Sequence, residues 1–245
     1  MVRPYSLVPG PVPGKRWTIM TYEMIGKELI ELLGLKGSPV AVKLVSTPAD
    51  VPAGYEKMTK KERHCQFVQD TRLKGVTGYA TRGEHLCKGG AAVMGIEPSP
   101  DLVADGTTYQ KLGNFKTIEG AVETVHAIPK VDKPYYASVY APLEKAEFEP
   151  DVVVFIVTPR QALRLSQAYL HTSGGRISSD YSGIQSLCAD AVVAVRERGV
   201  PNMTLGCNGS RKYSGIAEDE VILGFPPKEL GAMVEALKAF KQKWG

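Results

Sequence analysis

The chain has 245 residues, of which 43% are hydrophobic, and it carries 30 Lys and Arg against 26 Asp and Glu. At this length folding buries roughly 70–75% of the unfolded surface, so neither a metal nor a disulfide is needed merely to fold. The hydrophobic fraction and the lack of repeating composition exclude a disordered, collagenous or coiled-coil protein. The basic residues are scattered, and the longest strongly apolar run, Val152–Val157, is far below the ~20 residues that span a bilayer. We therefore expect neither a nucleic-acid partner nor a membrane span.

Residues 1–20 are predicted to form an extended, Pro-rich arm. Pro4, Pro9, Pro11 and Pro13 stand where a secreted protein has an apolar signal core, which favours a polyproline-like conformation and a cytoplasmic location. Four cysteines in a chain of this size do not make a disulfide scaffold, and in a reducing cytoplasm we expect them to be thiols.

Helices and strands alternate in the first half of the chain. Apolar residues recur at helical spacing from Tyr22 to Leu33, between a capping Thr21 and a terminating Gly34. The run VAVKLV at Val40–Val45 then predicts a strand. The other elements expected here are a helix over Lys60–Leu73, a strand over Val76–Thr81, a loop entering a short helix over Glu84–Gly95, and strands over Glu123–Ile128 and Ala137–Tyr140. Residues 97–120 are rich in turn formers and give no clear element.

The second half contains the clearest strand of the chain, VVVFIV at Val152–Val157. Its unbroken apolar character predicts burial on both faces. The elements expected after it are helices over Ala162–Tyr169 and Leu187–Val195, strands over Met203–Leu205 and Glu220–Phe225, and an amphipathic helix over Leu230–Phe240.

Two stretches resemble each other in order and spacing. In each, a β-branched strand ends at Thr-Pro, a later helix has a Cys near its start and ends at Gly-Val, and a second Cys follows in a Cys-x-Gly loop. Cys65 and Cys87 occupy these points in the first stretch, and Cys188 and Cys207 occupy them in the second. Chance similarity is the alternative, because strand–helix units are common.

This repeat predicts a mixed α/β fold of internally duplicated strand–helix units. Residues 21–245 would form a single globular domain of two similar halves, about 21–130 and 131–245, around a mixed sheet with a pseudo-twofold axis. Equivalent loops would then face each other at the junction of the halves, where pockets are favoured.

The four cysteines are the main candidates for chemistry. No Cys-x-x-Cys occurs, so neither the thioredoxin motif nor the usual zinc-finger spacing is present. Soft thiolates suit iron–sulfur clusters, so Cys65, Cys87, Cys188 and Cys207 are predicted to ligate a cluster or another metal. The neighbouring His64 and His85 are further candidate ligands.

Two other roles remain open for these thiols. Cys188 falls on an apolar face with Ala191 and Val192, where a buried Cys acts as a small hydrophobe. Cys65 follows Arg63 near a helix start, an environment that lowers a thiol pKa and favours a nucleophile.

The two Cys-x-Gly loops also resemble anion-binding loops. Glycine lets backbone N–H groups approach an anion, and a neighbouring cation supplies charge. The candidate cofactor- or ligand-binding residues are Lys88, Gly89, Gly90, Gly209 and Arg211. Ordinary tight turns with solvated basic residues are the alternative, because neither loop fits a known nucleotide fingerprint.

Several motifs together resemble a known family. They are PVAVKL, the Cys65-Gln66 helix, the His85-x-Cys87 loop, the Pro150-Asp151-Val-Val strand, and the Cys207-x-Gly-x-Arg211 loop before Asp219-Glu220. Together, between about Gly37 and Phe225, they are similar to family 169 of the domains of unknown function, found in archaea and anaerobic bacteria. The resemblance implies a cytoplasmic protein of anaerobes and brings no established catalytic or cofactor residues.

The sequence thus leads to two hypotheses for function. In the first, the protein binds a thiolate-ligated cofactor, an iron–sulfur cluster or another metal, at the junction of two halves and acts in redox chemistry or cofactor handling. In the second, it is a metal-free protein that binds a small anionic molecule through its Gly/basic loops, and its thiols are structural.

Overall fold

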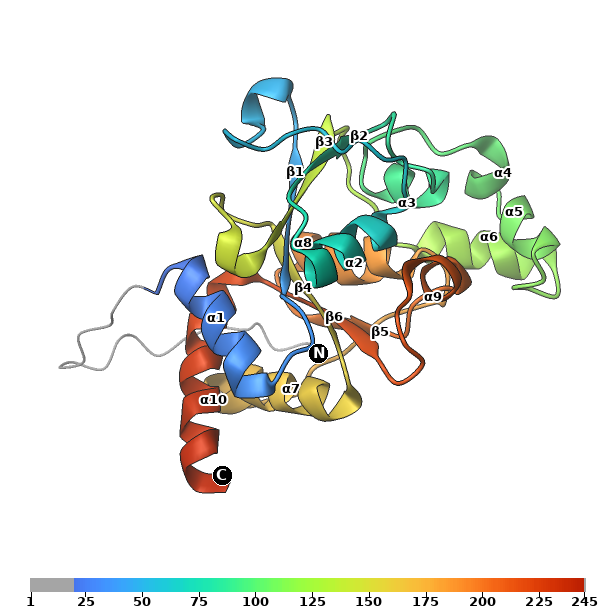
Figure 1. Cartoon of the computed structure of the whole chain (residues 1–245). Coiled ribbons are helices and arrows are strands. Elements are labelled where there is room, and N and C mark those ends of the chain that lie inside the picture. Colours follow the sequence, from blue (N-terminus) through green and yellow to red (C-terminus); the bar gives the residue numbers. More distant parts are fainter. Residues whose placement is uncertain (1–19, 245) are drawn as a thin grey trace.

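A computed structural model describes residues 20–244, and the arm expected at residues 1–20 lies almost wholly outside them. A six-stranded sheet in the order β2-β3-β1-β4-β6-β5 lies at the centre of the described part (Figure 1). The strands are β1 (Val40–Val45), β2 (Gly78–Thr81), β3 (Ala137–Pro142), β4 (Val152–Val157), β5 (Asn202–Thr204) and β6 (Val221–Phe225). The predicted mixed α/β class is confirmed, but these six strands pair antiparallel throughout, without the parallel pairs of a mixed sheet.

Helices cover both faces of this sheet. They are α1 (Tyr22–Leu33), α2 (His64–Lys74), α3 (Lys88–Val93), α4 (Asp101–Ala104), α5 (Thr107–Lys111), α6 (Ile118–Ala127), α7 (Pro159–Ser173), α8 (Ala194–Arg198), α9 (Asn208–Ser214) and α10 (Leu230–Trp244). A π-helix at Ser186–Val193 leads directly into α8. None of the helices within residues 20–244 combines the length and apolar character that a membrane span requires.

The central strand β4 shows why the sheet is covered on both sides. All six of its residues are buried, as its unbroken apolar run predicts. Val153 and Phe155 contribute to one core with α1, α7 and α10. Val152 and Val154 contribute to a second core with α2 and the π-helix. Because neighbouring residues of a strand point to opposite faces, one apolar segment serves both cores.

The strand order is symmetric about the centre of the sheet. In each half the first strand is central, the second lies at the edge and the third lies between them, as β1, β2, β3 and again as β4, β5, β6. The two central strands pair antiparallel, with Ala41 opposite Val153. This order agrees with the predicted twofold arrangement, and the internal duplication itself stays a prediction.

One predicted strand is wrong. Residues 123–127 form the second half of helix α6, and Ile128 directly follows it. The helix begins after Thr117, whose hydroxyl accepts the N–H of Gly120 at 3.3 Å. The β-branched residues suggested a strand, but this cap and the buried Ala121 favour a helix with one face on its neighbours. The turn-rich residues 97–120 contain α4 and α5, which lie beside α6 at one end of the molecule (Figure 1).

Candidate functional site

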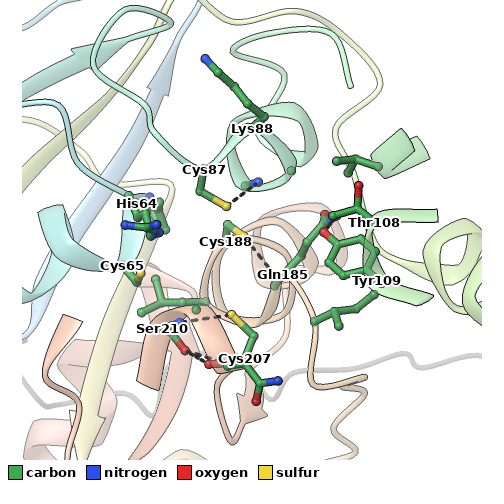
Figure 2. Close-up of a pocket in the computed structure, with 18 of the residues that line it drawn as sticks. His64, Cys65, Cys87, Lys88, Thr108, Tyr109, Gln185, Cys188, Cys207 and Ser210 are labelled. Carbon is green, nitrogen blue, oxygen red and sulfur yellow. Dashed lines mark hydrogen bonds between the residues drawn. The ribbon is translucent and has the colours of Figure 1, made fainter. Parts of the chain in front are cut away.

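One pocket brings together all four cysteines of the chain. Its volume is about 280 Å³ and its wall is mainly apolar. The four residues come from the first turn of α2 (Cys65), the position before α3 (Cys87), the π-helix (Cys188) and the position before α9 (Cys207). Figure 2 shows their side chains directed toward a common space.

Cys87 and Cys207 occupy the N-cap positions of two short helices. The Cys87 sulfur accepts the backbone N–H of Gly90, and the Cys207 sulfur accepts that of Ser210, both at 3.4 Å. Sulfur in a neutral thiol is a weak acceptor, and a charged thiolate makes a stronger hydrogen bond to the same donor. The backbone therefore provides a fixed donor for negative charge on each of these two sulfurs.

Cys188 and Cys87 flank the backbone of Gly90. A Cβ atom added at Gly90 would lie 3.3 Å from the Cys188 sulfur and 3.4 Å from the Cys87 sulfur. The absence of a side chain at this position thus leaves room between two thiols. Cys188 donates its own hydrogen bond to the carbonyl of Gln185, the residue before the π-helix, at 3.2 Å.

Burial keeps Cys65 and Cys188 protonated in the metal-free protein. Removal from water, together with the nearby Cys207 and Cys87, raises the pKa of Cys65 to about 12, because burial disfavours the thiolate and neighbouring thiolates repel. Burial raises the pKa of Cys188 as well, again with a contribution from the other three cysteines. The nucleophile hypothesis for Cys65 is not favoured, because a raised pKa leaves little of the reactive thiolate.

The described side chains do not form a site for a single metal ion. Two thiolates on one zinc ion lie within about 4.6 Å of each other, because each Zn–S bond is about 2.3 Å long. Within residues 20–244, no three His, Cys, Asp or Glu side chains are grouped closely enough to hold one ion. The four sulfurs instead line the wall of a larger space.

The two histidines beside the cysteines have different positions. His64 lines the pocket, whereas His85 is not among the lining residues and contacts Phe67. His64 Nδ1 bonds to the Tyr140 hydroxyl at 2.7 Å, Tyr140 to Ser138 at 2.8 Å, and His85 Nε2 to Ser138 at 3.0 Å. All four side chains are buried.

His64 is a neutral ring with one nitrogen that has no partner. Burial, followed by the effect of His85, lowers the pKa of His64 to about 3, so the ring is neutral. Its Nδ1 is hydrogen-bonded to the Tyr140 hydroxyl, and its Nε2 has no partner within the described part of the chain.

The predicted anion-binding residues separate into two groups. Lys88, Gly89, Gly90 and Gly209 all line the pocket, although the Lys88 ammonium pairs with Glu97 at 3.1 Å. Arg211 is not among the lining residues. Its guanidinium donates to the backbone carbonyls of Leu205, Ala217 and Glu220 and so ties together the loop around α9.

The outer wall of the pocket was not predicted from the sequence. It comes from the turn-rich region, where Thr108 and Tyr109 belong to α5, and from Gln185. In Figure 2 these three residues lie on the side of the pocket opposite His64 and Cys65. The sequence contains only a weak sign of a special role for Gln185. It stands at the N-cap position of an apolar helix, where Ser, Thr, Asp or Asn is usual.

Comparison with known proteins gives the family of the chain. A family model described as uncharacterised ArCR, domain of unknown function 169, matches residues 28–236, and the chain belongs to this family. It is 53% identical over 219 residues to the uncharacterised protein MJ0308 of the archaeon Methanocaldococcus jannaschii, with 89% of this chain and 94% of the relative covered. No solved structure matches the chain. The predicted family resemblance is thereby confirmed.

Proposed function

We propose that this protein binds an iron–sulfur cluster through Cys65, Cys87, Cys188 and Cys207 and serves redox chemistry or cofactor handling. The observation that carries the proposal is that all four cysteines of the chain, from four separate elements, line one pocket. Four thiolates are the ligand set of a four-iron cluster. A cluster is larger than a single ion, so its ligands stand further apart and can line a pocket such as this one.

The surroundings of the sulfurs support the same ligand. Gly90 leaves space between Cys87 and Cys188, which a methyl group would narrow. The N–H groups of Gly90 and Ser210 donate to Cys87 and Cys207, and hydrogen bonds to the sulfurs are one means by which proteins set a cluster's reduction potential.

Charge balance gives a second argument. Burial and mutual repulsion oppose the ionisation of Cys65 and Cys188 in the metal-free protein, because each raises the pKa of a buried thiol. A structural role gives no reason for all four thiols of the chain to converge on one pocket. Iron supplies the positive charge that compensates four neighbouring thiolates.

The rival hypothesis of an anionic ligand is less well supported. Arg211 directs its guanidinium to backbone carbonyls, and Lys88 is paired with Glu97. The pocket wall is mainly apolar. An anion placed there would lie among four sulfurs, while the two cations that line the described pocket, Lys88 and Arg63, already contact Glu97 and the Tyr213 ring.

Analysis of iron and acid-labile sulfide in protein purified without oxygen tests the proposal. We expect a brown protein that contains both elements, and a large loss of both in each single Cys→Ser variant. Ser166→Ala, on α7 across the sheet, is a matched control and should retain them. Colourless protein that takes up neither element on anaerobic reconstitution, or equal contents in the Cys→Ser variants, would contradict the proposal.

A further inference from the structure

Gln185 is held in an unusual conformation at the outer wall of the pocket. Within residues 20–244 it is the one residue other than glycine with a positive φ, at 51°. Its side-chain Nε2 donates to the Tyr109 hydroxyl at 2.5 Å. The residue is only 7% exposed, and its Oε1 has no partner in the described part of the chain. The amide is therefore held in place through its Nε2, and its Oε1 is an acceptor without a hydrogen bond.

The packing around this amide is close. A Cβ atom added at Gly89 would lie 2.9 Å from the Tyr109 hydroxyl and 3.0 Å from Gln185 Nε2. The Gln185–Tyr109 pair thus requires glycine behind it. A buried acceptor without a hydrogen bond lowers the stability of the fold by about 1–3 kcal/mol. An apolar leucine or methionine at position 185 would avoid this loss, which favours a ligand that donates to Oε1.

The pocket beside Gln185 has a mainly apolar wall. Leu112 and Val103 contribute to its outer wall. The two lining cations are engaged elsewhere, because Lys88 pairs with Glu97 and the Arg63 guanidinium lies 3.7 Å from the centre of the Tyr213 ring. The other unpartnered side-chain atom in the described wall, His64 Nε2, lies on the inner side. On the outer side the unpartnered atom is Gln185 Oε1, a carbonyl oxygen that accepts, so this side selects for a donor.

We propose that the outer part of the pocket binds a small neutral molecule with an apolar body and an N–H or O–H group, whose hydrogen Gln185 Oε1 accepts. At about 280 Å³ the whole pocket is nearly twice the ~150 Å³ cavity that holds benzene, so it has room for such a molecule next to the cysteines. The site does not depend on the cluster, because none of the residues that form it is a cysteine.

Phenol and toluene are suitable probes, because they share one ring and one size and only phenol has an O–H group. Dissociation constants for both are measured by NMR titration of the metal-free, full-length protein. We expect phenol to bind more tightly than toluene. Gln185→Leu should weaken phenol binding about five- to tenfold, the effect of one lost hydrogen bond, and leave toluene binding unchanged.

Two further variants separate recognition from structure. Gln185→Glu keeps an acceptor at this position and should retain phenol binding. Tyr109→Phe breaks the Gln185–Tyr109 hydrogen bond but keeps Oε1, and it should change phenol affinity less than twofold. If Gln185→Leu fails to fold, Gln185→Met, which also lacks the acceptor, takes its place with the same expected loss of phenol binding.

The proposal is overturned if phenol does not bind, if the two probes bind alike, or if Gln185→Leu keeps the preference for phenol. It is also overturned if phenol affinity falls in Tyr109→Phe as much as in Gln185→Leu, since the amide would then act only through packing. None of these results bears on iron binding, so this proposal and that of the cluster fail separately.

Discussion

Cys87 and Cys207 stand in equivalent positions of the two halves of the sheet. Each directly precedes a short helix that follows an edge strand, β2 or β5, and each sulfur accepts the backbone N–H three residues further on at 3.4 Å. The same local structure therefore places a sulfur at the same pocket twice. This relationship underlies the account of the site as one assembled from both halves.

The raised pKa of Cys65 predicts a pH-dependent stability of the metal-free protein. Below pH 9 the thiol is neutral in the folded and unfolded chains alike. Between its ordinary value of 9.0 and about 12, the unfolded chain releases a proton that the folded chain keeps, so rising pH favours unfolding. The melting temperature should therefore fall more steeply over this range in the wild type than in Cys65→Ala. Equal slopes would show that the folded state does not hold this proton.

Gly90→Ala should reduce cluster content without weakening the fold. Alanine is favoured over glycine inside a helix by roughly 0.5–1 kcal/mol, so α3 itself tolerates the change. The added methyl group, however, would press on the sulfurs of Cys87 and Cys188. We expect a near-normal melting temperature of the metal-free protein together with a lower iron content. Gly231→Ala in α10, where nothing lies within 4 Å of the new Cβ, is the control; the same iron content in both variants would contradict the prediction.

Arg211→Ala should destabilise the protein. The guanidinium donates to the carbonyls of Leu205 and Glu220, each at 2.8 Å, and to Ala217, and a hydrogen bond from a charged group contributes about 1.5–3 kcal/mol. Urea unfolding should show a loss of this size, and the exposed neighbour Lys212→Ala should show none. Unchanged stability with weakened binding of inorganic phosphate would instead restore the anion-binding role predicted from the sequence.

Breaking the buried pair between Arg72 and Glu220 should have a larger effect. Arg72 donates to the Glu220 carboxylate, and both side chains are less than 10% exposed. Removal of one partner leaves a buried charge, which costs about 3–5 kcal/mol. Glu220→Gln should therefore lower the free energy of unfolding markedly, measured by urea denaturation. A loss no greater than that in Glu218→Gln, an exposed neighbour, would show that the pair contributes little.

Much of the fold could be predicted because it depends on local patterns. The strands at Val40–Val45 and Val152–Val157 follow from unbroken apolar runs, and α1 begins after Thr21 and ends before Gly34 as expected. The sequence pattern predicts a strand in the α6 segment because the segment is rich in β-branched residues. The helix that forms there instead begins at the Thr117 cap. The antiparallel pairing could not be predicted, because strand direction depends on contacts between segments distant in the sequence.

The residues of the site likewise differ in how far local sequence patterns predict them. The four cysteines could be predicted as site residues because they occupy corresponding positions in two similar stretches of the sequence. The role of Arg211 was harder to predict, since whether an arginine faces a ligand or a backbone carbonyl depends on the path of the loop around it. Tyr109 and Gln185 have only a weak signal in the sequence, because they meet only when α5 folds against the start of the π-helix.

X-ray absorption spectroscopy at the iron edge, on protein reconstituted anaerobically, tests the central claim most directly. The account predicts iron surrounded by sulfur alone, with a second shell of iron neighbours that marks a cluster, and the loss of this second shell in Cys188→Ser. Iron bound by oxygen or nitrogen without iron neighbours, or an unchanged spectrum in Cys188→Ser, would contradict the assignment of the four cysteines as cluster ligands.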